Sequence, residues 1–259
     1  MSALRAGLDG VLLDIDDTLV DTHASFRAGM AAVASDYLPH LQDDGPQLAL
    51  AHWHADERGF YPRFVAGDID FLQQRRLRAE AMQQDLGGPA LDDASFERWN
   101  AIYDSAFRQA WVALPGAVEL LHALTASGVP FGAVTNHVVG YQRDKLERTG
   151  LSQLRIVVGT DTLGVGKPER AVFRHACALI GCEPDRTVYV GNDLAVDAEG
   201  ALDAGLQAVW LDRGIDHRGA GSTVAPPPAA GVSVLHDLGE LFRWLGLAAA
   251  DLGPGAADR

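Results

Sequence analysis

Acidic side chains gather directly after the first apolar run of the chain. Residues 10–13 (Gly-Val-Leu-Leu) are rich in strand formers, and Asp14, Asp16 and Asp17 follow them almost at once. Carboxylates packed this closely repel one another unless a cation or a shared proton lies between them. One carboxylate can attack an electrophilic centre, and a second can transfer a proton. The ordinary alternative is a solvated acidic loop, and this run alone does not decide between the two.

Three further groups of polar residues follow three later apolar runs. They are Thr135-Asn136 after residues 131–134, Lys167 after residues 156–158, and Gly191-Asn192-Asp193 after residues 187–190. Each group alone has an ordinary explanation as a turn, a solvated lysine or the acidic first turn of a helix. Ligands of open α/β sheets bind outside the carboxyl ends of the strands. Four such groups, each at an expected strand end, therefore predict one site.

The apolar runs alternate with amphipathic stretches. A fifth apolar run covers residues 207–211, and the helical patterns cover residues 115–127, 141–149, 168–180 and 194–204. Continuous apolar runs of this length suit strands that are buried on both faces, as in a parallel sheet. The sequence therefore predicts an α/β fold with a doubly wound parallel sheet. Residues 214–231 read as a surface loop and residues 234–247 as a last helix.

The stretch from residue 22 to residue 112 has a different pattern. It contains aromatic and aliphatic residues at helical spacing and has no clear strand run. We expect an α/β core made of residues 1–21 and 113–247, with residues 22–112 inserted as a helical domain. Residues 248–259, which are mostly Ala, Gly, Pro and Asp, read as a flexible tail.

The composition excludes several classes of protein. The formal net charge of -14 over 259 residues argues against a nucleic-acid partner, because such proteins need positive charge. No segment reaches the roughly 18 apolar residues of a membrane span, so we expect no membrane and a cytoplasmic location. Cys177 and Cys182 read as reduced thiols without a metal or redox motif. The oligomeric state stays open between monomer and homodimer.

The four polar groups resemble the four motifs of the haloacid dehalogenase superfamily, whose members are mostly phosphatases. Residues 14–18 (Asp-Ile-Asp-Asp-Thr) are similar to its Asp-x-Asp-x-Thr signature, Thr135 to its second motif, Lys167 to its third and residues 191–197 to its acidic fourth. Residues 114–211 are similar to the family core throughout. Residues 22–112 resemble its α-helical cap of the first type. The resemblance implies a Rossmann-like core with an inserted cap domain.

The resemblance also implies roles for the residues. Asp14 would be the nucleophile, Asp16 the general acid and base, and Thr135 and Lys167 the phosphate-binding members of a catalytic set. Thr18, Asn136 and the cap residue Arg63 are candidate substrate contacts. Mg²⁺ would be held by Asp14, by the backbone carbonyl of Asp16 and by a residue of the fourth motif.

The fourth motif departs from the family pattern. The family usually has Gly-Asp there, whereas this chain has Gly191 followed by Asn192 and then Asp193. The third metal ligand is therefore either the neutral oxygen of Asn192 or the carboxylate of Asp193, and Asp197 would be the second acid of the motif. His137, which follows Asn136 where small residues are usual, is expected to cap or line the following helix and not to take part in catalysis.

The resemblance predicts a magnesium-dependent phosphatase that acts on a small phosphorylated metabolite, either a sugar phosphate or a nucleoside 5′-monophosphate, through an aspartyl-phosphate. A 2-haloacid dehalogenase is disfavoured by Asp16, because halide leaves without a proton. A phosphomutase is compatible with the same motifs, and Asn192 also leaves open a non-catalytic phosphate-binding protein. Further cap candidates for specificity are His52, Trp53, His54, Tyr61, Arg75, Arg76 and Arg78. Trp53 fits cap core better, and the three arginines cannot share one helix face.

Overall fold

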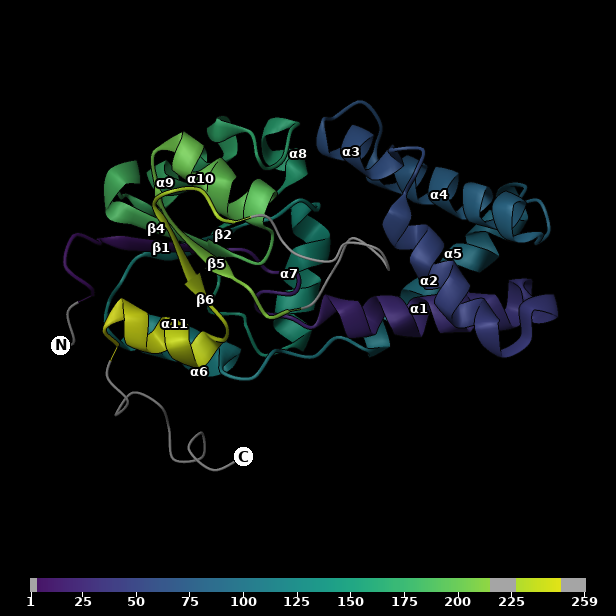
Figure 1. The fold of residues 1–259 in the computed structure, drawn as a ribbon, viewed down its shortest axis with the longest axis horizontal. Coiled ribbons are helices and arrows are strands. Elements are labelled where there is room, and N and C mark those ends of the chain that lie inside the picture. The colour runs from purple at the N-terminus through teal and green to yellow at the C-terminus, as the bar shows by residue number, and fades with distance from the viewer. Residues whose placement is uncertain (1–3, 215–226, 248–259) are drawn as a thin grey trace. The chain divides into compact units, whose positions relative to one another are not determined.

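The computed structural model describes residues 4–214 and 227–247. Within them a parallel six-stranded sheet has the order β3-β2-β1-β4-β5-β6 (Figure 1). The strands are β1 (Gly10–Leu13), β2 (Phe131–Val134), β3 (Val157–Val158), β4 (Thr187–Gly191), β5 (Gln207–Leu211) and β6 (Val232–Leu235). The predicted doubly wound α/β fold is confirmed. The predicted tail at residues 248–259 and most of the predicted loop at 214–231 lie outside the described residues.

The end of the sheet differs from the sequence-based expectation. One helix is predicted over residues 234–247, but β6 takes Val232–Leu235 and α11 covers only Leu238–Leu245. Val232 and Val234 pair with β5 in parallel register. Asp237 then starts the helix, because its side chain accepts a hydrogen bond from the backbone N–H of Glu240. An edge strand with only two valines gives a weak pattern of its own.

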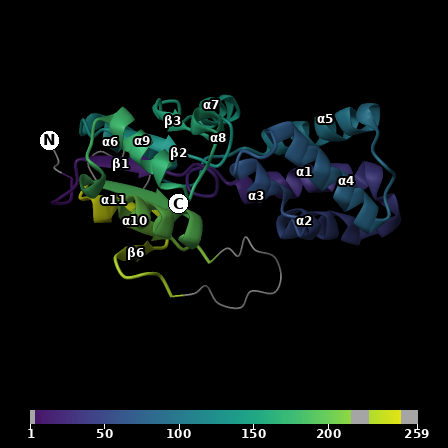
Figure 2. The ribbon, with the colours of Figure 1, turned by 90° about the horizontal axis from the view of Figure 1, so that it is seen from above.

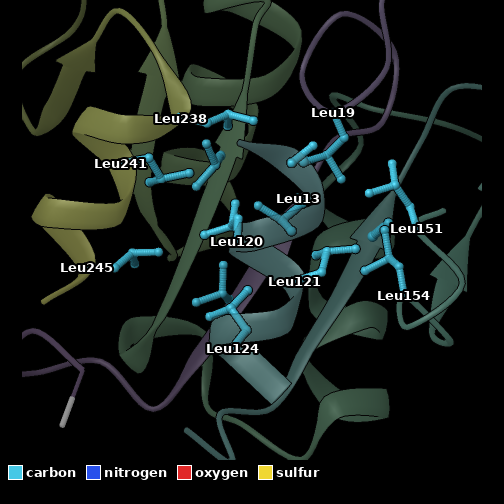
Figure 3. Close-up of a cluster of buried hydrophobic side chains, with 14 of the residues drawn as sticks. Leu13, Leu19, Leu120, Leu121, Leu124, Leu151, Leu154, Leu238, Leu241 and Leu245 are labelled. Carbon is cyan, nitrogen blue, oxygen red and sulfur yellow. The ribbon is translucent and has the colours of Figure 1, made fainter. Parts of the chain in front are cut away.

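Helices cover both faces of the sheet (Figure 1). One face carries α6 (Ala117–Ala126) and α11, and the other carries α9 (Arg170–Ile180) and α10 (Gly200–Ala204). Figure 3 shows leucines of α6 and α11 meeting Leu13 of β1 in one buried cluster. Leu12 and Tyr189, which are neighbours in the register of β1 and β4, are also fully buried. The sheet is therefore buried on both faces, which explains its continuous apolar runs.

The remaining core helices stand near the carboxyl ends of the strands. They are α7 (Val139–Arg148), α8 (Thr160–Leu163) and a short π-helical segment, η3 (Leu194–Glu199), that precedes α10. A single turn of 3-10 helix, η2 (Pro184–Arg186), instead leads into the start of β4. The sequence predicts one helix over 194–204. The backbone carbonyl of Asp193 accepts hydrogen bonds from the N–H groups of both Asp197 and Ala198, which widens this turn. Such π segments occur often at functional sites.

Residues 21–111 form a second compact unit, and residues 4–20, 112–214 and 227–247 belong to the first. The second unit is helical, with α1 (Thr22–Tyr37), η1 (Pro39–Asp44), α2 (Gly45–Ala55), α3 (Phe60–Val65), α4 (Phe71–Leu86) and α5 (Asp93–Gln109). In Figure 2 α1 runs beside α2 and α5, and it packs against both. None of the helices in the described parts of the chain is both long and apolar enough to cross a membrane.

Aromatic rings form the core of this helical unit. Trp99 and Tyr103, four residues apart on α5, are stacked with their ring centroids 5.4 Å apart. Trp53 of α2 joins them and is 2% exposed, as the core interpretation of this residue predicted. Gly29 allows α1 to approach α5, because a Cβ there would lie 2.8 Å from the ring of Tyr103. The periodic aromatic residues of the sequence thus account for this packing.

Candidate active site

The predicted site residues start from the carboxyl edge of the sheet. β1 lies between β2 and β4, and the chain order reverses beside it, which is where open α/β sheets bind ligands. The backbone N–H of Asp14 donates to the carbonyl of Val190 at 2.8 Å, so Asp14 continues β1 next to β4. On the other side, the N–H of Thr135 donates to Val158 at 2.9 Å. The fold therefore explains why residues far apart in sequence meet here.

A buried ion-pair network surrounds the carboxylate of Asp14. The ammonium of Lys167 donates to Asp14 Oδ1 and to Asp197 Oδ1, each at 2.7 Å. It also lies 2.9 Å from the hydroxyl of Tyr189, which in turn donates to the carbonyl of Val134 at 2.9 Å. The side chains of Lys167, Asp14 and Asp197 are 4%, 6% and 2% exposed. One lysine is thus shared by two carboxylates in a site shielded from water.

The network has one more negative charge than Lys167 can balance. Burial raises the pKa of Asp14 to about 7, the charges of Asp197 and Asp16 push in the same direction, and Lys167 opposes them. Burial also disfavours the charge of Lys167, but the carboxylates of Asp14 and Asp197 outweigh it and hold the pKa of Lys167 well above its ordinary value. Lys167 therefore stays protonated, and Asp14 is a carboxylate that gains from an added cation.

The second oxygen of Asp14 faces other oxygens. The hydroxyl of Thr18, which is fully buried, lies 3.2 Å from Asp14 Oδ2 and 3.3 Å from Asn192 Oδ1. A hydroxyl has one proton and cannot donate to both acceptors at once. The carboxylate and the amide oxygen therefore both lie within reach of one hydroxyl, and hard cations such as Mg²⁺ take oxygen ligands of this kind. Thr18, predicted as a substrate contact, here touches Asp14 and Asn192.

The two candidates for the third metal ligand are placed differently. Asn192 is half-buried, and its side-chain oxygen contacts the same Thr18 hydroxyl that contacts Asp14. Asp193 is exposed, and its carboxylate accepts from the backbone N–H of Val196 at 2.9 Å, as the N-cap of η3. The described residues contain no group of three or more His, Cys, Asp or Glu side chains that could hold a metal ion. A magnesium site here would therefore need the neutral oxygen of Asn192 together with a backbone carbonyl.

Asp16 is held by helix α7. Its carboxylate forms an ion pair with Lys145 and accepts a hydrogen bond of 2.6 Å from the side-chain amide of Gln142. The same amide of Gln142 donates to the hydroxyl of Thr135 at 2.8 Å. Gln142 is fully buried and Lys145 is 1% exposed. Two catalytic candidates, Asp16 and Thr135, are thus joined through one helix face.

Asn136 and His137 make contacts that support the site. The side chain of Asn136 accepts from the backbone N–H of Lys167 at 2.6 Å and donates to its carbonyl at 2.9 Å. It therefore fixes the loop that carries the lysine. The Nδ1 atom of His137 accepts from the backbone N–H of Val138, and its ring stacks on Tyr141 at 4.4 Å. His137 therefore lines α7 through Tyr141 and does not supply the N-cap of this helix, which is Val138.

The chain matches the family described as haloacid dehalogenase-like hydrolase over residues 8–205. The chain belongs to this family. It is therefore an enzyme, a hydrolase, and the superfamily resemblance of its four motifs is confirmed.

Two curated relatives of this hydrolase cover most of its length. Pyrimidine 5′-nucleotidase YjjG of Escherichia coli is 30% identical over 90% of this chain and 97% of its own. Phosphoserine phosphatase of Thermus thermophilus is 27% identical over 79% of this chain and 89% of its own.

Solved structures share the fold. The magnesium-bound HAD-hydrolase YfnB from Bacillus subtilis matches with a TM-score of 0.74 and 21% identity, over 93% of this chain and 99% of its own. The L-2-haloacid dehalogenase PA0810 matches with a TM-score of 0.70 and 23% identity, over 92% and 99%. A HAD phosphatase from Thermococcus onnurineus also matches, with a TM-score of 0.62 and 22% identity over 92% of this chain and 98% of its own. The fold is therefore shared with structures named for both chemistries and does not choose between them.

The candidate specificity residues of this hydrolase lie in the helical unit. Arg63 is exposed on α3. Arg75 is buried and contacts Asp104 and Asn100 at 3.1 Å each, whereas Arg76 is half-exposed and pairs with Glu80 and Asp93. Arg78 stacks on Trp53 with 4.0 Å between the guanidinium carbon and the ring centroid. The three helix arginines therefore point to different surroundings, as their spacing predicted, and all contact residues of their own unit.

Sequence reasoning missed several residues that the hydrolase brings to its site. They are Gln142, Lys145 and Tyr189, and the sequence marks Asp197 only as a possible second acid. Gln142 and Lys145 lie three positions apart in a stretch that reads as a polar helix, so a polar pair at helical spacing was the available signal. Tyr189 lies inside an apolar strand and gave no signal, because a strand tyrosine is usually core.

Proposed function

We propose that this hydrolase is a magnesium-dependent phosphatase that cleaves a small phosphomonoester through an aspartyl-phosphate. The proposal rests chiefly on one arrangement. Asp14 is buried at the end of β1 with one oxygen held by Lys167 and the other directed toward Thr18 and Asn192. A second carboxylate, Asp16, stands two residues away on the same turn.

In the first step a carboxylate oxygen of Asp14 attacks phosphorus and forms an acyl-phosphate bond. The bond between phosphorus and the ester oxygen breaks, and its electron pair goes to the leaving oxygen. Asp16 in its acid form gives that oxygen a proton, so the product leaves as an alcohol. Lys167 and Thr135 bind phosphate oxygens and offset the charge that moves during transfer.

In the second step water releases the phosphate. Asp16, now a carboxylate, takes a proton from the attacking water as its oxygen bonds to phosphorus. The bond between phosphorus and Asp14 breaks, and the carboxylate of Asp14 is restored. Both residues thus return to their starting forms, and one water is consumed for each ester cleaved.

The donor atoms of the site fit Mg²⁺. Asp14, the backbone carbonyl of Asp16 and the side-chain oxygen of Asn192 would hold the ion, with Asp193 as the less favoured candidate for the third position. When bound, Mg²⁺ supplies positive charge that lets a carboxylate approach a phosphate dianion. The neutral amide of Asn192 should make binding weaker than an aspartate would.

The substrate is a sugar phosphate or a nucleoside 5′-monophosphate in this proposal. A curated relative named as a pyrimidine 5′-nucleotidase supports the nucleotide. Relatives named as phosphatases of ribulose-1,5-bisphosphate and of glyceraldehyde 3-phosphate support the sugar phosphate. The helical unit, taken as residues 22–112, would be the cap that selects the substrate. Residues 1–21 and 113–247 would form the α/β core. Arg63 of the cap is a candidate substrate contact. A cytoplasmic location and a monomeric or homodimeric state stay predictions.

A haloacid dehalogenase is the second candidate, because enzymes with that chemistry share the fold. The presence of Asp16 argues against a dehalogenase, because a halide leaves without a proton. The deciding experiment offers the purified protein 4-nitrophenyl phosphate, a panel of phosphorylated metabolites and 2-chloropropionate, with Mg²⁺ and with EDTA. We expect magnesium-dependent phosphate release and no chloride release. Chloride release without phosphate release would reverse the assignment.

The same experiment distinguishes a phosphatase from a phosphomutase and from a non-catalytic protein. A phosphomutase would return phosphate to an isomer of its substrate and release little inorganic phosphate. A non-catalytic protein would bind phosphate and release none from any ester.

A further inference from the structure

Helix α7 presents two polar side chains to the site from one face. Gln142 and Lys145 are three residues apart, and side chains at that spacing share a helix face. Both are at least 99% buried, and both contact the carboxylate of Asp16. Asp144 and Arg148 of the same helix form an ion pair with each other at 2.9 Å, and their side chains are 34% and 54% exposed. The helix therefore carries both buried and solvent-accessible charged residues.

The buried pair is a poor way to stabilise a fold. Removing an ammonium from water is unfavourable, and an apolar residue of similar volume is often as good or better. Lys145 also loses the freedom of four rotatable bonds, which opposes folding. Asp16, its partner, remains 29% exposed, so the carboxylate is still open to a small molecule. A lysine buried behind a partly exposed carboxylate is therefore better explained by the orientation it gives that carboxylate than by a gain in core stability.

Gln142 adds a second constraint. Its amide nitrogen lies 2.6 Å from Asp16 Oδ2 and 2.8 Å from Thr135 Oγ1, while Lys145 engages Asp16 Oδ1. Both oxygens of Asp16 are thus held, and one of the holding groups is also bonded to the residue that would bind phosphate. The proton-transfer group and the phosphate-binding group are therefore fixed relative to each other.

We propose that Lys145 and Gln142 are positioning residues that aim the carboxyl group of Asp16 at the leaving oxygen of the bound ester. The inference rests on the proposed phosphatase function. It assigns these two residues no contact with the substrate. Proton transfer depends on hydrogen-bond geometry, and a misplacement of about 1 Å can cost about 10²-fold in rate. Loss of the pair should therefore lower the rate most for esters whose leaving group must be protonated.

The test compares two aryl esters in the full-length protein. 4-Nitrophenolate leaves readily without a proton, whereas phenolate is a poorer leaving group and depends on Asp16. In Lys145→Met, an apolar side chain fills the buried space, and water can solvate the partly exposed Asp16. We expect kcat/KM for phenyl phosphate to fall about 10- to 100-fold and that for 4-nitrophenyl phosphate by less than about 5-fold, with KM changed less than kcat. Arg148→Met, at an exposed position of the same helix, is the matched control and should leave both esters unchanged.

A double-mutant comparison isolates the route of the effect. If Lys145 acts only through Asp16, Asp16→Asn and the double variant Asp16→Asn/Lys145→Met should have the same kcat/KM for phenyl phosphate. Gln142→Leu carries the same two-ester test if Lys145→Met does not fold. A further loss in the double variant, or an equal loss on both esters, would overturn the inference. So would failure of both Lys145→Met and Gln142→Leu to fold by circular dichroism, because the pair would then serve the fold.

The two levels of the hypothesis fail separately. If the wild-type protein cleaves no phosphate ester, the proposed function is wrong and this inference is wrong with it. If the wild-type protein is active and Lys145→Met keeps the wild-type ratio between the two esters, only the positioning role is wrong.

Discussion

At the scale of single residues, Asp14 is the proposed nucleophile, and it lies where burial disfavours its negative charge. Its carboxylate is buried, competes with Asp197 for one lysine and has a pKa raised to about 7 by burial first of all. Residues that serve catalysis are often destabilising where they stand. Asp14 should therefore cost stability when no cation is present.

The variant Asp14→Asn tests both properties. Phosphate release should fall by at least about 10³-fold, because an amide cannot form the acyl-phosphate bond. In EDTA at pH 8 the melting temperature should rise by about 2–4 °C, the change that about 1 kcal/mol gives in a protein of this size. Phosphate assays and thermal unfolding measure the two effects. Retention of full activity would contradict the covalent mechanism.

Asn192 and Asp193 can be separated by their magnesium requirement. Asn192→Ala removes an oxygen that converges with Asp14, so the Mg²⁺ concentration for half-maximal activity should rise about 10-fold or more. Asp193→Ala removes the N-cap of η3 and should cost about 1 kcal/mol of stability with a much smaller change in magnesium requirement. Activity is titrated against Mg²⁺ for both variants. The reverse ranking would make Asp193 the ligand.

At the scale of elements, the turn from β4 into η3 depends on a close approach. A Cβ on Gly191 would overlap the carboxylate of Asp197, which anchors Lys167. Gly191→Ala should therefore displace Asp197, cost about 1–3 kcal/mol as overpacking does, and lower kcat at least about 10-fold. Thermal unfolding and steady-state kinetics would show both.

Gly140→Ala is the matched control for this substitution. A Cβ on Gly140 meets no atom within 4 Å, and the residue lies in α7, where alanine is the better helix former. It should keep activity and raise stability slightly. Equal losses in the two variants would show that the space around Gly191 is not the cause.

The elements differ in how far the sequence reveals them. The strands from Gly10–Leu13 to Gln207–Leu211 were predictable because burial on both faces makes each an uninterrupted apolar run. The edge strand Val232–Leu235 was missed, because its half-exposed residues alternate weakly and its partner lies elsewhere in the chain. The π segment was also missed, since it depends on the contacts of Asp193 and not on a period in the sequence.

The site residues follow the same division. Asp14, Thr135 and Asn192 were singled out because polar residues close behind apolar runs break a local pattern, whereas Lys167 lies further from its run and was singled out by its place among the four groups. Lys145 carried no such mark, since a lysine in a polar helix looks solvated until the fold brings it to Asp16, 129 positions away. Residues that act through contacts between distant parts of the chain therefore cannot be predicted from the periodicity of the sequence.

At the scale of the whole molecule, negative charge is in excess both over the chain and in the site. The chain carries a net charge of -14, and within it the carboxylates of Asp14 and Asp197 share one lysine. A phosphate ester would meet a negative protein and a negative nucleophile. Under the proposed function we therefore expect a cation to support both folding and activity.

Stability should consequently depend on Mg²⁺ and pH together. The pKa of Asp14 is about 7 in the folded protein against an ordinary 3.8, so the folded state binds more protons than the unfolded state in between. The contribution of Asp14 to metal-free stability thus falls as the pH rises from about 4 to about 7. Mg²⁺ binds the ionised form of Asp14. With a pKa of about 7, only about one Asp14 in 100 is ionised at pH 5, so the affinity for Mg²⁺ should be about 100-fold weaker at pH 5 than at pH 8.

Thermal unfolding with Mg²⁺ or EDTA at pH 5 and pH 8 measures this coupling, and the difference at each pH cancels groups that do not sense the metal. With Mg²⁺ at about 100 times its dissociation constant at pH 8, stabilisation should be about 2.7 kcal/mol, or about 5–10 °C. At pH 5 it should fall to about 0.4 kcal/mol, because the ion is then only near its dissociation constant. Asp14→Asn, the control, should lose most of the stabilisation at pH 8. Equal stabilisation at both pH values would mean that the ion does not bind through Asp14.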